Sequence, residues 1–254
     1  MQVWLKGDFG MEQCNMEFKA IQTPDGFWCF EQNGVRSFLI EGIDDALVID
    51  TCFGGDLAEL CRLYTSHPIQ LLLTHSDHDH VGCVDQFDYY MMHPSEFDRW
   101  ANLGGNLKKA IPAWEGENFN LTANYQITGY SLDVVHLPGH TPGSIGLIER
   151  QRRFLIAGDV IQNSHIYMFG PGRNLAAYRA SLLKLMGMED AIDRIYSSHG
   201  DMVVRSEFIR QMYCFVNDIS RGLIKDHKPA TAHLNLPENI RLFERDECQI
   251  LLEV

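Results

Sequence analysis

Short apolar runs separated by turn-forming residues fill the first fifty positions, and this pattern predicts β-strands. The runs cover residues 17–21, 27–30, 35–40 and 46–50. Asn33-Gly34 separates two runs that are rich in apolar and aromatic residues, which is a strong signal for a β-hairpin. The chain is therefore expected to begin with paired strands.

The pattern then changes to strands that alternate with helices. A helix is predicted over residues 57–65, where Asp56 can cap the N-terminus and Glu59 stands three positions later, as in a capping box. Such alternation is typical of α/β folds. The expected strands after this helix cover residues 69–73, 132–137, 154–157, 192–196 and 249–252.

Two later helices are marked by apolar residues that recur every three or four positions. One begins at about Leu175, with Asn174 as its cap, and stops at Gly187. The other begins at Ser206 and ends before Gly222. This spacing is typical of helices that pack on a core. The expected buried faces contain Leu175, Tyr178, Leu182 and Leu185 in the first helix, and Phe208, Met212, Phe215, Val216 and Ile219 in the second.

Neither a repeat nor a linker divides the sequence, so a single domain over residues 1–254 is expected. Residues 100–130 are rich in Gly and Asn and weakly patterned. We interpret them as an inserted loop or helical excursion near the active site.

The most informative polar residues directly follow the apolar runs. Residues 75–80 read His-Ser-Asp-His-Asp-His, and residues 138–143 read Pro-Gly-His-Thr-Pro-Gly. Gly158-Asp159 and Ser198-His199-Gly200 follow two later runs. Several strand ends that each deliver a histidine or aspartate indicate one metal site on a rigid sheet edge.

The spacing within the first cluster suggests how it is used. In an extended loop alternate residues point the same way, so His75, Asp77 and Asp79 can face one cavity while His80 turns in from the bend. His140 and His199 would arrive from distant strands, and Asp159 could bridge two ions with its two oxygens. Asp50 ends another strand at the same presumed edge and could support a ligand from behind.

These motifs, in this order, resemble the metallo-β-lactamase superfamily, whose pattern is His-x-His-x-Asp-His, the Pro-Gly-His turn, Gly-Asp and a late His. The resemblance implies a four-layered αβ/βα sandwich with two divalent metal ions at one edge. It also implies a first metal held by His75, position 77 and His140. A second metal would be held by Asp79, His80 and His199, with Asp159 as the bridge.

Position 77 departs from that pattern, because the family usually has His where this chain has Asp77. The substitution raises the number of carboxylates at the site from two to three. Harder oxygen ligands shift the preference of the site from zinc toward manganese or iron. Zinc stays the first expectation, and manganese and iron are the alternatives. Asp is also shorter than His, so it draws the loop inward or leaves the first site weakly filled.

The favoured hypothesis is a dinuclear metal-dependent hydrolase that uses a metal-bridging hydroxide on a small ester, thioester, lactone or phosphodiester. Asp79 would orient the hydroxide in addition to binding metal. His165, Tyr167 and Arg173 are candidates for binding the small-molecule substrate.

Two other hypotheses stay open. An acidic residue at position 77 resembles the diiron flavoproteins of the superfamily, which carry Glu there and react with oxygen or nitric oxide. His75, His140 and Asp159 would supply the iron ligands of a persulfide dioxygenase, which is a second form of iron oxidoreductase. The third hypothesis is a metal-stabilised scaffold without catalytic activity.

Composition narrows the expected partners. Thirty-four acidic against 21 basic residues give a formal net charge of −13, which argues against nucleic acid and anionic membrane surfaces. The seven cysteines are scattered and contain no Cys-x-x-Cys pair, which fits reduced thiols in the cytoplasm. The oligomeric state is not indicated by the sequence.

Overall fold

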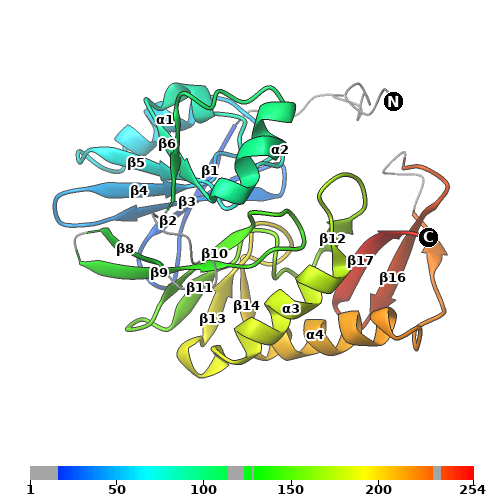
Figure 1. Ribbon diagram of the computed structural model, residues 1–254. Helices are drawn as coiled ribbons and strands as arrows, with labels where there is room; N and C mark the ends of the chain where they lie inside the picture. The colour runs from blue at the N-terminus through cyan, green and yellow to red at the C-terminus, as the bar shows by residue number, and fades with distance from the viewer. Residues whose placement is uncertain (1–16, 114–122, 128, 231–235) are drawn as a thin grey trace.

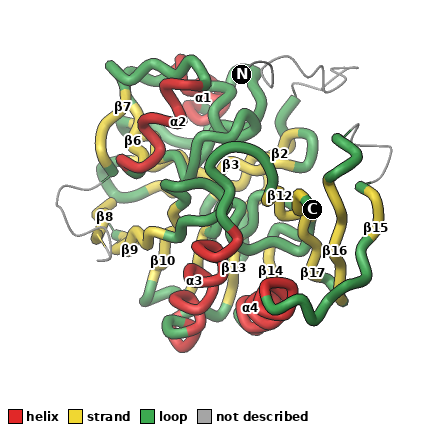
Figure 2. Tube along the Cα trace, turned by 45° about the vertical axis from the view of Figure 1, so that its right-hand side comes forward, coloured by secondary structure: helices red, strands yellow, loops and turns green. Residues whose placement is uncertain are grey.

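The computed structural model describes residues 17–113, 123–127, 129–230 and 236–254. Two β-sheets lie face to face, and helices cover the outer face of each sheet (Figure 1). Helices α1 and α2 lie on one side, and α3 and α4 lie on the opposite side (Figure 2). The expected four-layered α/β sandwich is therefore confirmed.

The first sheet contains the strands that open the chain. The first four strands pair antiparallel, and the remaining neighbours are parallel. In spatial order its strands are β1 (Lys19–Gln22), β2 (Trp28–Gln32), β3 (Val35–Glu41), β4 (Ala46–Ile49), β5 (Ile69–Leu72), β6 (Tyr90–Met92) and β7 (Ala110–Pro112). Asn33 and Gly34 have φ values of 51° and 81°, so the predicted hairpin turn is confirmed.

The second sheet supplies the opposite half of the sandwich. In spatial order its strands are β14 (Val203–Arg205), β13 (Arg194–Tyr196), β11 (Phe154–Ile156), β10 (Ile145–Glu149), β9 (Tyr130–His136) and β8 (Ala123–Ile127). Strand β10 is antiparallel to both β9 and β11, and β13 is parallel to β11. The carboxyl ends of β9, β11 and β13 therefore lie at the same edge of the sheet.

A third sheet lies beside the sandwich, at the right of Figure 1. In spatial order its strands are β12 (His165–Met168), β17 (Cys248–Glu253), β16 (Ile240–Arg245) and β15 (Lys228–Pro229). Because β12 pairs with β17, the end of the chain is tied to a strand that follows Asp159 in the sequence.

The helices pack their apolar faces onto the sheets, as the spacing predicts. They are α1 (Leu57–Arg62), α2 (Phe97–Asn102), α3 (Leu175–Met186) and α4 (Glu207–Ser220), with short 3-10 turns at Val84–Gln86, Pro94–Glu96 and Glu189–Ala191. Tyr178 of α3 and Phe215 of α4 are fully buried against the second sheet. Asn174 caps α3 by accepting a hydrogen bond from the Ala177 amide at 2.9 Å, which confirms the predicted cap.

The inner core lies between the two sheets. Phe27 contacts the rings of Tyr196 and Phe154, with centroids 4.7 Å and 5.3 Å apart. Phe38 of the first sheet and Leu147 of the second are also buried there. Since each sheet is covered on both faces, strands such as β4 and β10 are buried along their whole length.

Two sequence predictions differ from the structure. Helix α1 ends at Arg62 instead of residue 65, and the Asp56 side chain makes no capping bond. The Ala58 amide instead donates to Gln86 Oε1 at 2.9 Å, so a distant side chain does the capping. The segment at 100–130 includes strands β7 and β8, one in each sheet, and residues 114–122 and 128 lie outside the described residues.

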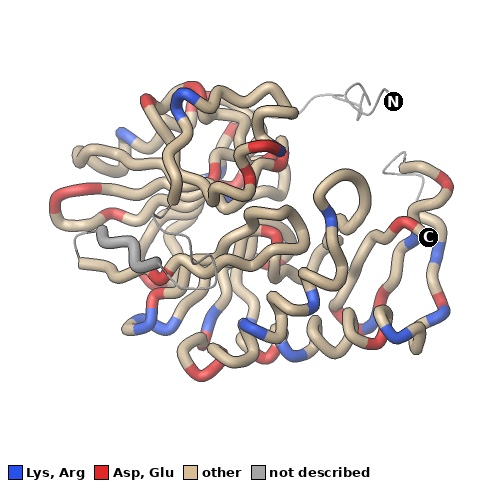
Figure 3. The backbone as a smooth tube through the Cα atoms, in the orientation of Figure 1, with Lys and Arg blue, Asp and Glu red and all other residues tan. Residues whose placement is uncertain are grey.

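The charged residues are dispersed over many elements. Figure 3 shows Lys and Arg interspersed with Asp and Glu along strand ends, helices and loops of the described chain. None of the helices within the described ranges combines the length and the apolar character that crossing a membrane requires.

Candidate metal centre

All seven predicted metal-binding residues meet at one edge of the sandwich. Their ligand atoms form three overlapping groups, and within each group these atoms lie within 4.8 Å of one another. The groups are His75, Asp77 and His140, then Asp79, His80 and His199, and finally His75, His80 and Asp159.

The topology explains why residues up to 124 positions apart converge, from His75 to His199. His75 follows β5, whereas His140, Asp159 and His199 follow β9, β11 and β13, whose carboxyl ends share one edge. The Ile145 amide donates to the Thr74 carbonyl at 3.0 Å, which joins the two sheets at this edge. The ligands are thus placed by rigid strands instead of by the loops alone.

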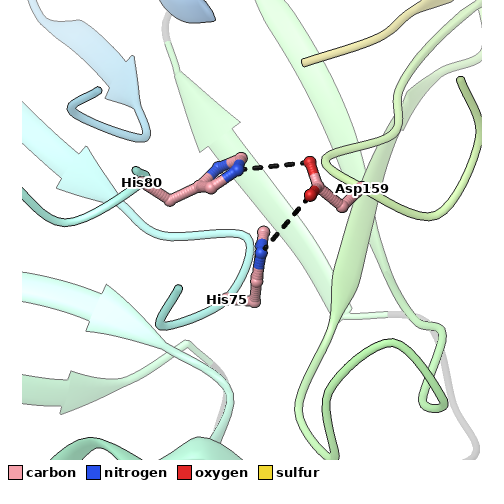
Figure 4. A group of neighbouring side chains, drawn as sticks. All are labelled: His75, His80 and Asp159. Carbon is pink, nitrogen blue, oxygen red and sulfur yellow. Dashed lines mark ion pairs between the residues drawn. The ribbon is translucent and has the colours of Figure 1, made fainter. Parts of the chain in front are cut away.

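Asp159 lies between the two ligand groups. Its Oδ1 lies 3.2 Å from His80 Nε2 and 3.5 Å from His199 Nε2. Its Oδ2 lies 3.5 Å from His140 Nε2 and 4.0 Å from His75 Nε2 (Figure 4 shows His75, His80 and Asp159). Each carboxylate oxygen therefore faces a different group, as a bridging ligand requires.

Groups behind the histidines hold their rings so that Nε2 points inward. Asp50 Oδ2 lies 2.8 Å from His80 Nδ1 and accepts from Thr74 Oγ1 at 2.6 Å. Thr74 Oγ1 is in turn 3.0 Å from His75 Nδ1. The Tyr167 carbonyl lies 3.1 Å from His140 Nδ1. A partner on Nδ1 fixes the tautomer that leaves Nε2 free to bind a metal.

The donor atoms fit a cation. His75 Nε2, His80 Nε2 and Asp159 Oδ1 are buried and have no hydrogen-bond partner among the described residues. Burying a polar atom without a hydrogen bond costs folding free energy, so three such atoms that converge on one point indicate a site for a bound cation. Imidazole nitrogen and carboxylate oxygen are ligands that zinc accepts, and manganese and iron also bind such mixed sets.

The electrostatics of this point are those of a cation site. Burial would lower the pKa of His80, but the carboxylates of Asp159, Asp79 and Asp50 raise it well above its usual value. Burial would raise the pKa of Asp159, but His199, His80 and His75 lower it well below its usual value. The carboxylates thus stabilise positive charge at these rings, and a metal ion can supply that charge.

Asp77 has a different environment, which the sequence did not show. Its Oδ1 accepts from Arg99 Nη2 at 2.5 Å, and its Oδ2 accepts from Arg173 Nη2 at 2.5 Å. Oδ2 also lies 3.1 Å from His140 Nε2. Burial opposes ionisation of Asp77, but Arg173, His140 and His75 hold its pKa well below the usual value. Burial, followed by the Arg173 charge, lowers the pKa of His140 to about 4.

Two further side chains fix the ligand loops. The fully buried Glu96 accepts from the Ser76 amide at 3.1 Å and from the Gly143 amide at 2.7 Å, so it joins two of the loops. Arg36 donates to the carbonyls of Ser197 and Gly200 at 3.1 Å and 2.5 Å, on either side of His199. Glu96, Arg36 and Arg99 belong to no motif, so nothing in the sequence marked them as part of this site.

The three residues predicted to bind substrate have different environments in the structure. Arg173 is bound to Asp77 and His140 instead of being free for a substrate. Burial raises the pKa of Tyr167, and the carboxylates of Asp79 and Asp159 raise it further, so this side chain lies near the centre. His165 begins β12 opposite Gln249, and its pKa is lowered by burial, which the Glu244 carboxylate opposes.

Known proteins with similar sequences are members of one superfamily and include hydrolases. The sequence model described as the metallo-beta-lactamase superfamily matches residues 31–199. The human acyl-coenzyme A thioesterase MBLAC2 is 24% identical over 217 residues, which cover 68% of this chain and 77% of that protein. The hydroxyacylglutathione hydrolase GloC of Haemophilus influenzae is 31% identical over 153 residues, which cover 52% of this chain and 68% of that protein.

Solved structures share the fold. A metallo-beta-lactamase from Pontibacter korlensis superposes with a TM-score of 0.66 at 14% identity. The match covers 80% of this chain and 100% of that chain. The structure called VMB-1 gives a TM-score of 0.67 at 13% identity and covers 81% of this chain and 99% of that chain.

Proposed function

The chain belongs to the metallo-beta-lactamase superfamily and is a metal-dependent hydrolase, and we propose that it cleaves small thioesters at a centre of two metal ions. The observation that carries the two-ion proposal is Asp159, whose two oxygens face two separate groups of ligands. Bound there, two divalent ions, with zinc as the first candidate, would supply a water of lowered pKa and polarise the carbonyl oxygen.

The residues of the chain divide the remaining work. His75, Asp77 and His140 would hold one ion, and a second group of Asp79, His80 and His199 would hold the other. Asp79 is the most exposed of the carboxylates in these groups, with 23% of its side chain accessible, against 16% for Asp77 and 6% for Asp159. Its outward side can therefore accept a hydrogen bond from the attacking water and orient it toward the substrate.

Thioesters suit this centre for a chemical reason. A thiol has a pKa of about 8.5, so it can leave as a thiolate near neutral pH without a proton from the protein. A site of histidines and carboxylates is then sufficient. One relative is named as a thioesterase and another as a hydrolase of an acylated thiol, which supports this choice among the ester classes. Both are hydrolases, which does not favour the iron oxidoreductase that Asp77 suggested.

We also propose that the protein works in the cytoplasm. The six cysteines that the structure describes are all free thiols, and five of them are buried. Free buried thiols are typical of a reducing compartment, which supports the cytoplasm as the location.

The test is release of thiol from a panel of acyl-coenzyme A and acyl-glutathione thioesters, with lactones and oxygen esters alongside. The wild-type protein, purified without chelator, is expected to release thiol. His80→Ala and Asp159→Ala are expected to lose at least about a thousandfold of that rate, because removing a ligand removes the activated water. His78→Ala is the matched control, because His78 is exposed in the same loop and belongs to none of the ligand groups.

The proposal fails if thiol release survives in both ligand variants. It also fails if the wild-type protein holds two ions per chain and releases thiol from none of the panel.

A further inference from the structure

The two ligand groups differ sharply in charge. Both oxygens of Asp77 are bound by guanidinium groups, with Arg99 at 2.5 Å from one and Arg173 at 2.5 Å from the other. The first group therefore combines one carboxylate with two positive charges. In the second group, Asp79 forms ion pairs with His80 and His199, and none of the described Lys or Arg residues forms an ion pair with Asp79 or Asp159.

Neither arginine is free to move away from Asp77. Arg99 also donates from Nη1 to the Ser76 carbonyl at 3.0 Å and to Ser76 Oγ at 2.8 Å. Arg173 also donates from Nη1 to the His140 carbonyl, which lies in the second ligand loop. Only 19% of the Arg99 side chain and 10% of the Arg173 side chain is accessible. The two guanidinium groups are thus fixed parts of the first group.

We propose that Arg99 and Arg173 make metal binding sequential. The group of Asp79, His80 and His199, with Asp159, binds its ion first and tightly. The group containing Asp77 binds its ion at least about tenfold more weakly. This inference rests on the two-ion centre of the proposed function and assigns the two arginines as positioning residues for its metal.

The first group should bind its ion more weakly because the arginines compete with the ion for the Asp77 carboxylate and repel it. A divalent ion that binds Asp77 must share or displace an oxygen that a guanidinium already holds through a charge-assisted hydrogen bond. A positive charge that stays beside the same carboxylate also repels the ion. Even at the dielectric constant of water, this repulsion over a few ångströms corresponds to about tenfold in affinity. The second group carries neither penalty.

The experiment is a titration of metal-free protein with zinc, followed by calorimetry in the presence of a competing chelator. Elemental analysis after dialysis at defined free zinc gives the ions bound per chain. The wild-type protein is expected to show two steps that differ at least about tenfold in affinity. This measurement needs no variant, so it tests the proposal even where a substitution disturbs folding.

The variants then identify the cause. Arg99→Gln and Arg173→Gln are each expected to strengthen the weaker step by about tenfold and to leave the tighter step nearly unchanged. Arg173→Lys keeps the charge and is expected to leave the weaker step weak. Arg153→Gln is the matched control, because Arg153 pairs with Asp193 at an exposed position. Thermal unfolding of each variant checks that it is folded.

The proposal is overturned if the wild-type protein binds two ions with equal affinity. It is equally overturned if folded Gln variants bind the second ion as weakly as the wild type or more weakly, since the arginines would then serve only to orient Asp77. Thiol release distinguishes this failure from failure of the proposed function. Equal affinities with turnover would remove the inference alone, and two separate steps without turnover would remove the function alone.

Discussion

Asp50→Asn should weaken metal binding although Asp50 belongs to none of the ligand groups. The carboxylate is buried, and its Oδ1 accepts from the Thr74 amide at 2.7 Å. Its Oδ2 lies 2.8 Å from His80 Nδ1. The same oxygen is linked to His75 Nδ1 through the hydroxyl of Thr74. Both Nδ1 atoms therefore carry a proton, and both Nε2 atoms keep their lone pairs for the metal.

An asparagine at position 50 would reverse both hydrogen-bond chains. Its amide oxygen must face the Thr74 amide, which can only donate. The amide NH₂ group then faces His80 Nδ1 and Thr74 Oγ1, and each must become an acceptor. The protons of His80 and His75 move to Nε2, the atom that faces Asp159 in each ring. A protonated nitrogen cannot bind a metal, so the variant must break these hydrogen bonds, leave the Thr74 hydroxyl proton without an acceptor, or lose two ligands.

The size of the effect follows from the number of ligands affected. Loss of the group that orients one metal-binding histidine typically costs about 10- to 100-fold in affinity. Since Asp50 orients two histidines, we expect a loss of at least about 100-fold, or about 2.8 kcal/mol. The assay is zinc affinity by chelator competition. Asp193→Asn is the matched control, because it removes the same charge at an exposed position.

Asp50→Asn protein that is folded and binds zinc within about threefold of the wild type would refute this reasoning. The histidine tautomers would then be set by other groups, and the relay through Thr74 would have no role in metal binding.

Three further predictions concern the supports of the site and the stability of the fold. Glu96→Gln places an amide nitrogen against the backbone amide of Ser76 or Gly143, so urea unfolding should show a loss of about 1–3 kcal/mol, whereas the exposed Glu59→Gln should show almost none. Arg36→Gln removes two hydrogen bonds around His199, and the tighter zinc step should weaken about tenfold; unchanged affinity would contradict a positioning role. Burial, together with the neighbouring His136 and Lys184, lowers the pKa of His93 from 6.5 to about 3, so below pH 6.5 the unfolded chain binds a proton that the folded protein does not. Stability should therefore fall by about 2 kcal/mol between pH 6.5 and 5, and His93→Asn should flatten that slope in urea titrations at each pH.

Features that depend on neighbouring residues could be predicted from the sequence alone. The turn at Asn33-Gly34 needs residues that tolerate positive φ, and those two residues provide it locally. Helix α3 begins at its cap and buries the face that its spacing predicts. The order of the ligand motifs, each placed after a strand, was also readable, because strand ends are where a sheet presents side chains to a common edge.

Contacts between distant segments could not be predicted in this way. Asp77 is bound by Arg99 and by Arg173, which are 22 and 96 positions away, and Ala58 is capped by Gln86. The weakly patterned residues around β7 form a strand that pairs in parallel with β6. Such contacts are formed by packing between distant segments. The periodicity and spacing of residues along the chain therefore do not predict which arginine or glutamine makes them. The motifs therefore determined where the candidate metal centre lies, whereas the fold determined the charge around each of its residues.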